Sequence, residues 1–187
     1  LGLVPPEDLR SHIQEAVEVG HASRIGHGVD IMRETNSQKT LSEMRKDRVA
    51  VEIMPVSNQE ILEVSGEDHP FPIYLSRDVP IVLASDDPGV LRTDLTEQFV
   101  IIAHTYPQVN YSDIKSFVRN SLEYSFLRGD GIWAIPGNYS QIRKECAGCR
   151  PGTVCEECKA FLDKNEKAKA QWRLEGDLAL FESGVYN

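Results

Sequence analysis

The chain contains no apolar run approaching the roughly 20 residues that a membrane-spanning helix needs. Its first residues have neither the basic start nor the apolar core of a signal peptide. Basic residues are also few: 20 Lys and Arg stand against 29 Asp and Glu, for a formal charge of −9. Because contacts to nucleic-acid phosphates need clustered Lys and Arg, we expect no nucleic acid as partner, and the lack of a long apolar run predicts no membrane partner.

An initiator methionine is absent too, since the sequence begins at Leu1. We therefore expect a processed form or a portion of a longer protein, from which a targeting segment can be missing. The 187 residues are 41% hydrophobic and 26% charged, which is typical of a soluble protein with one core. A change of composition after the first two thirds predicts two parts, residues 1–128 and a tail at 129–187.

The stretch at residues 81–89 is an apolar run that ends in two adjacent carboxylates, Asp86 and Asp87. Pro80 and Pro88 bound the run, which predicts a short strand buried on both faces, as in a parallel sheet. The carboxyl ends of such strands carry active sites in α/β proteins. Two neighbouring carboxylates repel each other, so the pair indicates a bound cation, or else a helix cap in a solvated loop.

Two more strands are predicted upstream. Residues 23–28 form a short strand candidate that ends in His27 between two glycines, where the backbone can approach a neighbour closely. His27 fits a general base, a metal ligand or an electrostatic partner, or a turn histidine without a special role. Residues 49–54 are apolar except for Glu52, which needs a buried partner or a water-filled side.

Helix signals separate these strands. Four predicted helix starts carry a capping pattern: Thr40 with Glu43, Ser57 with Asn58, Asp94 with Glu97, and Ser112. The alternation of helices and strands predicts a parallel α/β sheet.

All four cysteines lie within thirteen residues, as Cys146-x2-Cys149-x5-Cys155-x2-Cys158. Paired Cys-x2-Cys units hold structural zinc in many proteins, but the usual gap between them is about 15–20 residues. Structural zinc, disulfides and free thiols therefore all remain open. Two Asn-x-Ser sequons, at Asn110 and Asn138, favour a secreted or extracytoplasmic protein.

The three strand ends read RIGHG at 24–28, VEIMPVSNQE at 51–60 and VLASDDPG at 82–89. Together they resemble the adenosine deaminase family, over about residues 3–127. The Ser57-Asn58-Gln59 triplet and the Asn-Ser-x2-Tyr-Ser motif at 120–125 resemble the secreted adenosine-deaminase-related growth factor branch.

This resemblance implies a (β/α)8 barrel, of which the chain would supply the C-terminal part, about strands six to eight with their helices, followed by a helical Cys-containing tail. It implies zinc-dependent hydrolytic deamination of adenosine, or of a related purine nucleoside or base, to inosine and ammonia. In the family pattern Asp86 binds the single catalytic zinc and His27 supports the zinc-bound water. Asp87 and Gly28 would contact the purine substrate.

The sequence departs from the family pattern because it contains no His-x-His pair and no His-Ala-Gly-Glu motif. Those motifs carry three zinc ligands and the proton donor, and one carboxylate cannot hold a catalytic zinc. We therefore expect this chain to carry part of an active site, with the rest of the barrel or self-association covering its open sheet edge. The alternative is a non-catalytic binding or growth-factor-like remnant of the same fold.

Overall fold

The computed structural model describes residues 5–153 and 155–184. Contacts divide the chain into two units, residues 1–118 and 119–187, and helix α7 (Tyr111–Glu123) carries the chain from the first to the second. The boundary expected at 128/129 stays a prediction. Within the described ranges, no helix combines the length and the apolar character that crossing a membrane requires.

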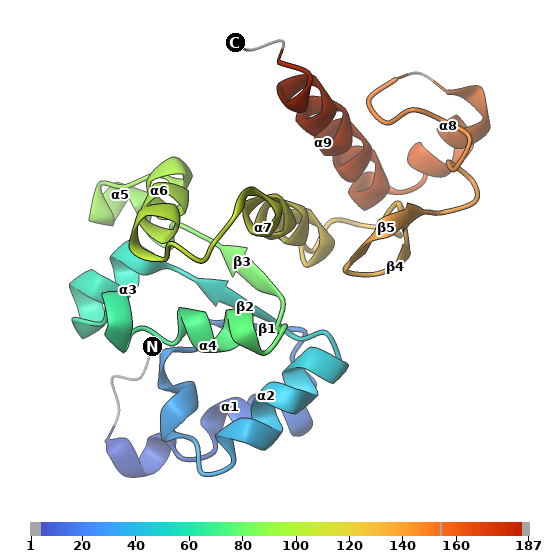
Figure 1. The fold of residues 1–187 in the computed structure, drawn as a ribbon. Helices are drawn as coiled ribbons and strands as arrows, with labels where there is room; N and C mark the ends of the chain where they lie inside the picture. The colour runs from blue at the N-terminus through green and yellow to red at the C-terminus, as the bar shows by residue number, and fades with distance from the viewer. Residues whose placement is uncertain (1–4, 154, 185–187) are drawn as a thin grey trace. The chain divides into compact units, whose positions relative to one another are not determined.

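The first unit is built on a parallel sheet of β1 (Arg24–Gly26), β2 (Ala50–Ile53) and β3 (Ile81–Leu83), in that order (Figure 1). The register aligns Ile25 with Val51, and Val51 with Ile81. β2 and β3 are short apolar runs beside a proline, interrupted only by Glu52, whereas β1 has the single large apolar residue Ile25 and ends at Gly26. The prediction of a parallel α/β fold is therefore confirmed.

Helical segments fill the sequence between and after these strands: η1 (Pro6–Leu9), α1 (His12–Glu18), η2 (Val29–Arg33), α2 (Ser37–Lys46), α3 (Pro55–Leu62), η3 (Gly66–Asp68), α4 (Phe71–Ser76), α5 (Pro88–Leu91) and α6 (Leu95–Thr105). Helices α1 and α2 pack against each other, and α3 packs against α6 (Figure 1).

The core of this unit lies on one face of the sheet. Because side chains alternate between the two faces of a strand, one set of strand residues points to the helices. This set is almost fully buried and joins the helical core residues in one cluster: Ile25, Val51, Ile53, Ile81 and Leu83 with Ile31, Leu41, Met44, Phe71, Tyr74 and Ile102. Each such side chain contributes about 1.5–3 kcal/mol to folding. The alternate set carries an ion pair, Arg24 Nε to Glu52 Oε1 at 3.2 Å, so Glu52 has a partner.

The predicted helix starts are partly wrong. Asp94 caps α6 as expected, because its Oδ1 accepts the N–H of Glu97 at 2.8 Å. Thr40 instead lies inside α2, which begins at Ser37 and ends at Lys46, and its hydroxyl bonds back to the Asn36 carbonyl at 3.3 Å. The spacing had matched a capping box, but Thr40 is fully buried and the turn starts before it.

Two other helices start earlier than predicted. Pro55 begins α3, since its fixed φ suits the first helical position, so Ser57 and Asn58 lie within the first turn. Asn110, not Ser112, caps α7: the Asn110 Oδ1 accepts the N–H of Ser112 at 2.8 Å. A proline thus sets the start of α3, and an asparagine two residues before Ser112 sets the start of α7.

The second unit pairs β4 (Trp133–Ile135) with β5 (Asn138–Ile142) in an antiparallel hairpin, followed by α8 (Glu156–Leu162) and α9 (Glu166–Glu182). Pro136 and Gly137 form the turn, and Gly137 has a positive φ of 70°. Pro followed by such a Gly is typical of a type II turn. Its core is small: Ile132, Trp133, Cys146, Cys158, Ala168 and Trp172.

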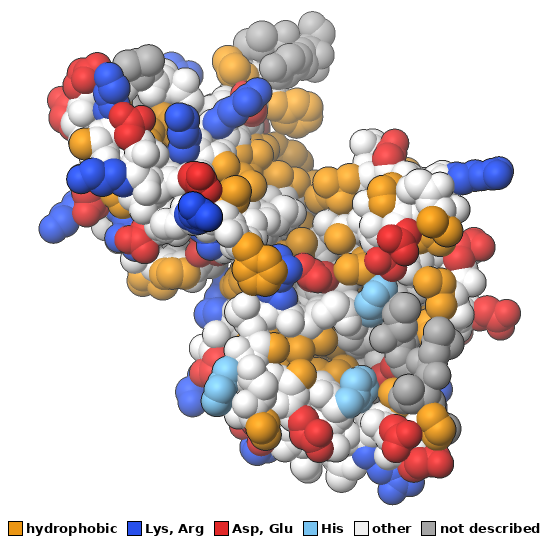
Figure 2. Space-filling model, turned by 180° about the vertical axis from the view of Figure 1, so that it is seen from behind, with side chains coloured by type: hydrophobic (Ala, Val, Ile, Leu, Met, Phe, Trp, Pro, Cys, Tyr) orange, Lys and Arg blue, Asp and Glu red, His pale blue; other side chains and the backbone are white. Residues whose placement is uncertain are grey.

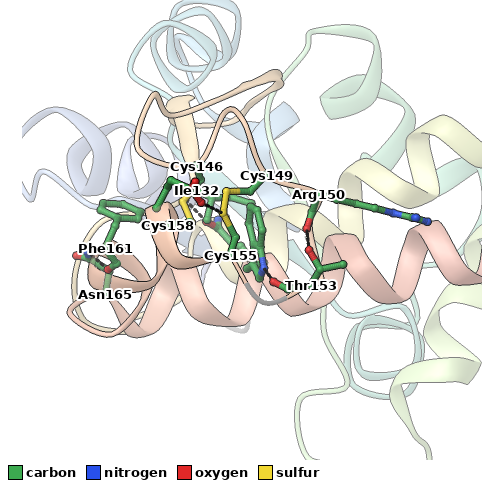
Figure 3. Close-up of a disulfide and its surroundings, with 12 residues drawn as sticks. Ile132, Cys146, Cys149, Arg150, Thr153, Cys155, Cys158, Phe161 and Asn165 are labelled. Carbon is green, nitrogen blue, oxygen red and sulfur yellow. Dashed lines mark hydrogen bonds between the residues drawn. A yellow bond between two sulfur atoms is a disulfide. The ribbon is translucent and has the colours of Figure 1, made fainter.

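The four cysteines form two nested disulfides, Cys146–Cys158 and Cys149–Cys155 (Figure 3). The loop between them is fastened to α9, because the indole N–H of Trp172 donates to the Thr153 carbonyl at 3.1 Å. The backbone of the loop also meets that helix: a Cβ on Gly152 would lie 2.5 Å from the Cα of Gly176. The tail is thus ordered around its cross-links rather than around a large core.

On the face drawn in Figure 2, acidic and basic side chains are interspersed, and Lys and Arg do not gather into one patch.

Candidate functional site

The candidate site lies at the carboxyl ends of the three parallel strands. His27 directly follows β1, Ser57 and Asn58 lie in the turn after β2, and Asp86 follows β3. Since the strands are parallel, these three segments leave the sheet at the same edge (Figure 1).

Two of these residues have an unusual backbone conformation. His27 has a φ of 64° and Asp86 a φ of 57°, in the left-handed region that side chains other than Gly rarely adopt. The sheet holds His27 there, because its N–H donates to the Glu52 carbonyl at 2.8 Å. Such strain costs about 1–3 kcal/mol per residue and is common at functional sites.

His27 and Asp86 face each other across a short gap. The Nε2 of His27 lies 3.8 Å from the Oδ2 of Asp86, and their side chains are 14% and 26% exposed. The hydroxyl of Ser57, which is fully buried, donates to the same Asp86 oxygen at 2.6 Å. Burial lowers the pKa of His27, and the Asp86 carboxylate opposes this effect by favouring the charged ring.

A buried chain of hydrogen bonds runs behind His27. Its Nδ1 lies 3.1 Å from the Nδ2 of Asn58, whose Oδ1 lies 3.0 Å from the Nε2 of His69. The Nδ1 of His69 accepts the N–H of Phe71 at 3.0 Å. Asn58 is fully buried and His69 nearly so, and burial lowers the pKa of His69 to about 4.

The loop that carries His27 is held in place by a buried tyrosine. The Tyr74 hydroxyl donates to the Gly28 carbonyl at 2.7 Å, and Tyr74 is fully buried. Burial raises the pKa of this phenol, as do the nearby Glu34 and Asp30 carboxylates. Gly28 has a φ of 62°, and a Cβ there would lie 2.5 Å from the Tyr74 oxygen. Only glycine fits this position without a shift of its neighbours.

The two adjacent carboxylates lie in different surroundings. Asp86 takes part in the cluster, whereas Asp87 is exposed at the start of α5, where its carbonyl accepts the N–H groups of Val90 and Leu91. Asp87 therefore offers its carboxylate to solvent beside the cluster.

Sequence reasoning missed part of this arrangement. The capping pattern predicts only a helix start at Ser57 and Asn58, and no motif in the sequence singles out His69. Ser57 and Asn58 follow a strand end, as His27 and Asp86 do, and this shared position was the signal that would have found them. His69 has no such signal, because its link to Asn58 depends on how η3 and α4 fold back.

The three strand ends and their contacts agree with a family comparison. The adenosine deaminase family model matches residues 9–136, more than half of the chain. The chain belongs to the adenosine deaminase family. The growth factor branch of that family stays a prediction.

Several proteins named as deaminases are similar to this chain. The adenosine deaminase of Clostridium perfringens (strain 13 / Type A) is 31% identical over 116 residues, which cover 62% of this chain and 34% of that protein. The adenosine deaminase of Aedes albopictus is 29% identical over 123 residues, covering 64% and 22%. The crystal structure of adenine deaminase from Arthrobacter aurescens superposes with a TM-score of 0.56 at 25% identity, covering 67% and 36%. The chain thus spans about a third or less of the length of these relatives.

The family's zinc needs several ligands, and the residues at this edge offer too few. Among the residues with a described position, the one trio of His, Cys, Asp or Glu close enough to hold a metal ion is Cys149, Cys155 and Glu157. Two of its members are joined in a disulfide, and it does not include Asp86. Among the described residues, the ends of the three strands therefore do not bring together a set of ligands that could hold a zinc ion.

Proposed function

We propose that this chain forms the C-terminal part of the active site of a zinc-dependent deaminase that converts adenosine, or a related purine nucleoside or base, to inosine-type products and ammonia. The convergence of His27, Ser57 and Asp86 at one sheet edge carries the proposal. The names of its relatives, adenosine deaminases and an adenine deaminase, support this substrate class.

In this proposal each residue at the carboxyl ends of the strands has its own role. Asp86 is one ligand of Zn²⁺, and the Ser57 hydroxyl fixes which carboxylate oxygen stays turned toward His27. His27 lies beside the position of the attacking water. Asp87, exposed next to the cluster, and the Gly28 loop meet the purine.

The remaining zinc ligands and the proton donor would come from parts of the family's fold that this chain does not include. We propose that β1, β2 and β3 correspond to about strands six to eight of a (β/α)8 barrel. In the sheet order β1-β2-β3, the outer strands β1 and β3 each have one side without a partner strand in this sheet. The backbone groups on such a side can pair with another chain and cause aggregation if they are left uncovered. The rest of the barrel, or a second copy of the chain, would cover them.

The test uses the full-length gene product that contains these residues. Asp86→Ala should abolish both adenosine deamination and bound zinc, measured by a coupled ammonia assay and by elemental analysis. Asp94→Ala is the matched control, because Asp94 caps α6 and bonds to Glu97, not to the cluster. Near-normal zinc content in the Asp86 variant would remove Asp86 from the ligand set, and a full-length product without deaminase activity would refute the proposal.

A second candidate function is a non-catalytic binding module. It is favoured by the incomplete ligand set around Asp86 among the described residues. The discriminating measurement is the activity of the full-length product supplied with zinc. Activity there, together with none in the 187-residue chain alone, supports a shared active site, whereas inactivity of both favours the binding module.

We also propose that the protein is secreted or extracytoplasmic. Two nested disulfides suit an oxidising compartment. Both sequon asparagines, Asn110 and Asn138, are exposed and so accessible for glycosylation. Treatment of the protein isolated from its source with a glycosidase should increase its gel mobility, and unchanged mobility together with reduced cysteines would contradict the proposal.

A further inference from the structure

The hydrogen-bond chain behind His27 has a direction that can be read from one end. Phe71 contributes a backbone N–H, which can only donate. Its partner, the Nδ1 of His69, must therefore carry a lone pair, so His69 is neutral and holds its proton on Nε2. The burial that lowers the pKa of His69 to about 4 agrees with this state.

The direction passes from His69 to Asn58. The Nε2–H of His69 needs an acceptor, and the group 3.0 Å away is therefore the Asn58 carbonyl oxygen. A flipped Asn58 side chain would set its NH2 group against the His69 N–H, leaving two donors face to face and both unsatisfied. Because Asn58 is fully buried, neither donor could turn to water instead, so both would remain unsatisfied. The amide orientation of Asn58 is thus determined by its neighbours.

The last link is His27. With its oxygen turned to His69, Asn58 turns its NH2 group to the Nδ1 of His27 at 3.1 Å. That nitrogen must accept, so the proton of the neutral His27 ring stays on Nε2. This nitrogen faces the Asp86 Oδ2 at 3.8 Å, which is too long for a direct hydrogen bond and leaves the N–H available to a group that approaches both side chains.

We propose that Asn58 and His69 are positioning residues that fix the tautomer of His27, so that His27 presents an N–H donor beside Asp86. The ring then acts as a hydrogen-bond donor toward the attacking water or the substrate. A ring with the opposite tautomer would present a lone pair to the carboxylate, repel it, and be unable to donate a hydrogen bond there. The functional part of this proposal rests on the proposed deaminase function, whereas the tautomer itself does not.

The tautomer can be measured in the 187-residue chain without any activity. Long-range ¹H–¹⁵N correlation spectra of the imidazole rings distinguish protonated from unprotonated nitrogens. At about pH 8, above the ordinary imidazole pKa of about 6.5, both His27 and His69 should be protonated at Nε2 only. A proton on Nδ1 of either ring in the unsubstituted chain would overturn the proposal, and this result needs no variant to fold.

Variants then test which residue sets the state of His27. Asn58→Asp replaces the NH2 donor by a carboxylate oxygen of nearly the same size, so the Nδ1 of His27 should become protonated while His69 keeps its Nε2 proton. His69→Gln retains an N–H donor toward Asn58 and should preserve the His27 tautomer, whereas His69→Leu should give a mixture. His104→Gln, on the exposed surface of α6, is the matched control and should change nothing at His27. An unchanged His27 ring in folded Asn58→Asp would refute the role of Asn58.

The functional readout uses the full-length gene product. Asn58→Asp should lower kcat about tenfold or more with KM changed less than about twofold, because the substrate contacts stay and the donor is lost. His69→Gln should retain more of the wild-type kcat than His69→Leu. If the unsubstituted full-length protein has no deaminase activity, the proposed function fails while the NMR result still decides the tautomer. If it is active and Asn58→Asp keeps wild-type kcat, the positioning role is refuted.

Discussion

Replacing Gly28 by alanine should destabilise the first unit strongly, and two separate costs explain why. Gly28 has a φ of 62°, and an L-residue in the left-handed region costs about 1–2 kcal/mol. The added Cβ would also lie 2.5 Å from the Tyr74 oxygen and 2.7 Å from the Val51 Cγ2. Both neighbours are fully buried and cannot move freely, and such overpacking costs about 1–3 kcal/mol.

The sum is about 2–5 kcal/mol, a large part of the roughly 5–15 kcal/mol by which a typical domain is stable. Urea unfolding followed by far-UV circular dichroism measures this loss. Fluorescence would miss it, since both tryptophans, Trp133 and Trp172, lie in the second unit. Gly89→Ala is the matched control: a Cβ at Gly89 meets nothing within 4 Å, so the free energy of unfolding should change by less than about 0.5 kcal/mol.

A double-mutant cycle isolates the part of the cost that comes from the clash with the Tyr74 oxygen. In a Tyr74→Phe background the clash with the phenol oxygen is gone, so Gly28→Ala should cost less there than in the unsubstituted chain, by about 0.5–3 kcal/mol. If Gly28→Ala costs no more than Gly89→Ala, the described packing of the His27 loop is wrong. Equal costs in both backgrounds would assign the effect to backbone strain and to the Val51 contact, both of which remain without the phenol oxygen.

Other substitutions and conditions probe the remaining contacts. In the full-length product, His27→Ala should lower kcat about 10²–10⁴-fold while bound zinc stays near normal, and wild-type turnover would refute its role. Tyr74→Phe alone leaves the Gly28 carbonyl without its main donor and should cost about 1–3 kcal/mol in urea unfolding, more than a surface Tyr→Phe change would. Cys146→Ser opens a disulfide across 12 residues and should destabilise the second unit by about 3 kcal/mol, seen by tryptophan fluorescence, without loss of turnover in the folded full-length protein. The folded pKa of His69 is about 4 against 6.5 for a free ring, so the folded state binds fewer protons in this window. The free energy of unfolding should therefore fall as pH falls from about 6.5 to about 4, by up to about 1.4 kcal/mol per pH unit, and His69→Gln should flatten this slope relative to the unsubstituted chain.

The sheet could be predicted from local sequence because β2 and β3 are short, largely apolar runs beside a proline and β1 ends at Gly26. The Asp94 cap was also predictable from local sequence, because the capping hydrogen bond joins residues only three apart. The alternation of elements then implied parallel pairing. Predictions made at this local scale failed where burial decided the outcome, as at Thr40, whose spacing suggested a cap although its side chain lies inside the core.

The candidate site was only partly predictable because its contacts join distant parts of the chain. Ser57 and Asp86 are 29 residues apart, and no periodicity links them. The left-handed backbone at His27 and Asp86 is also invisible in the sequence, since neither residue is a glycine. Four closely spaced cysteines left zinc, disulfides and free thiols open, and even disulfides alone allow three connectivities.

The contact between Gly152 and Gly176 restricts which amino-acid substitutions this tail can accept in evolution. Each position lacks a side chain because the other occupies that space, so an alanine at either one would push the cross-linked loop off α9. The loop would then also lose the indole bond from Trp172 to the Thr153 carbonyl. A substitution at one glycine cannot be repaired at the other, because both are already the smallest residue. We expect both glycines to be retained in any variant that keeps the loop on the helix. Exposed positions of α9 should accept many different residues.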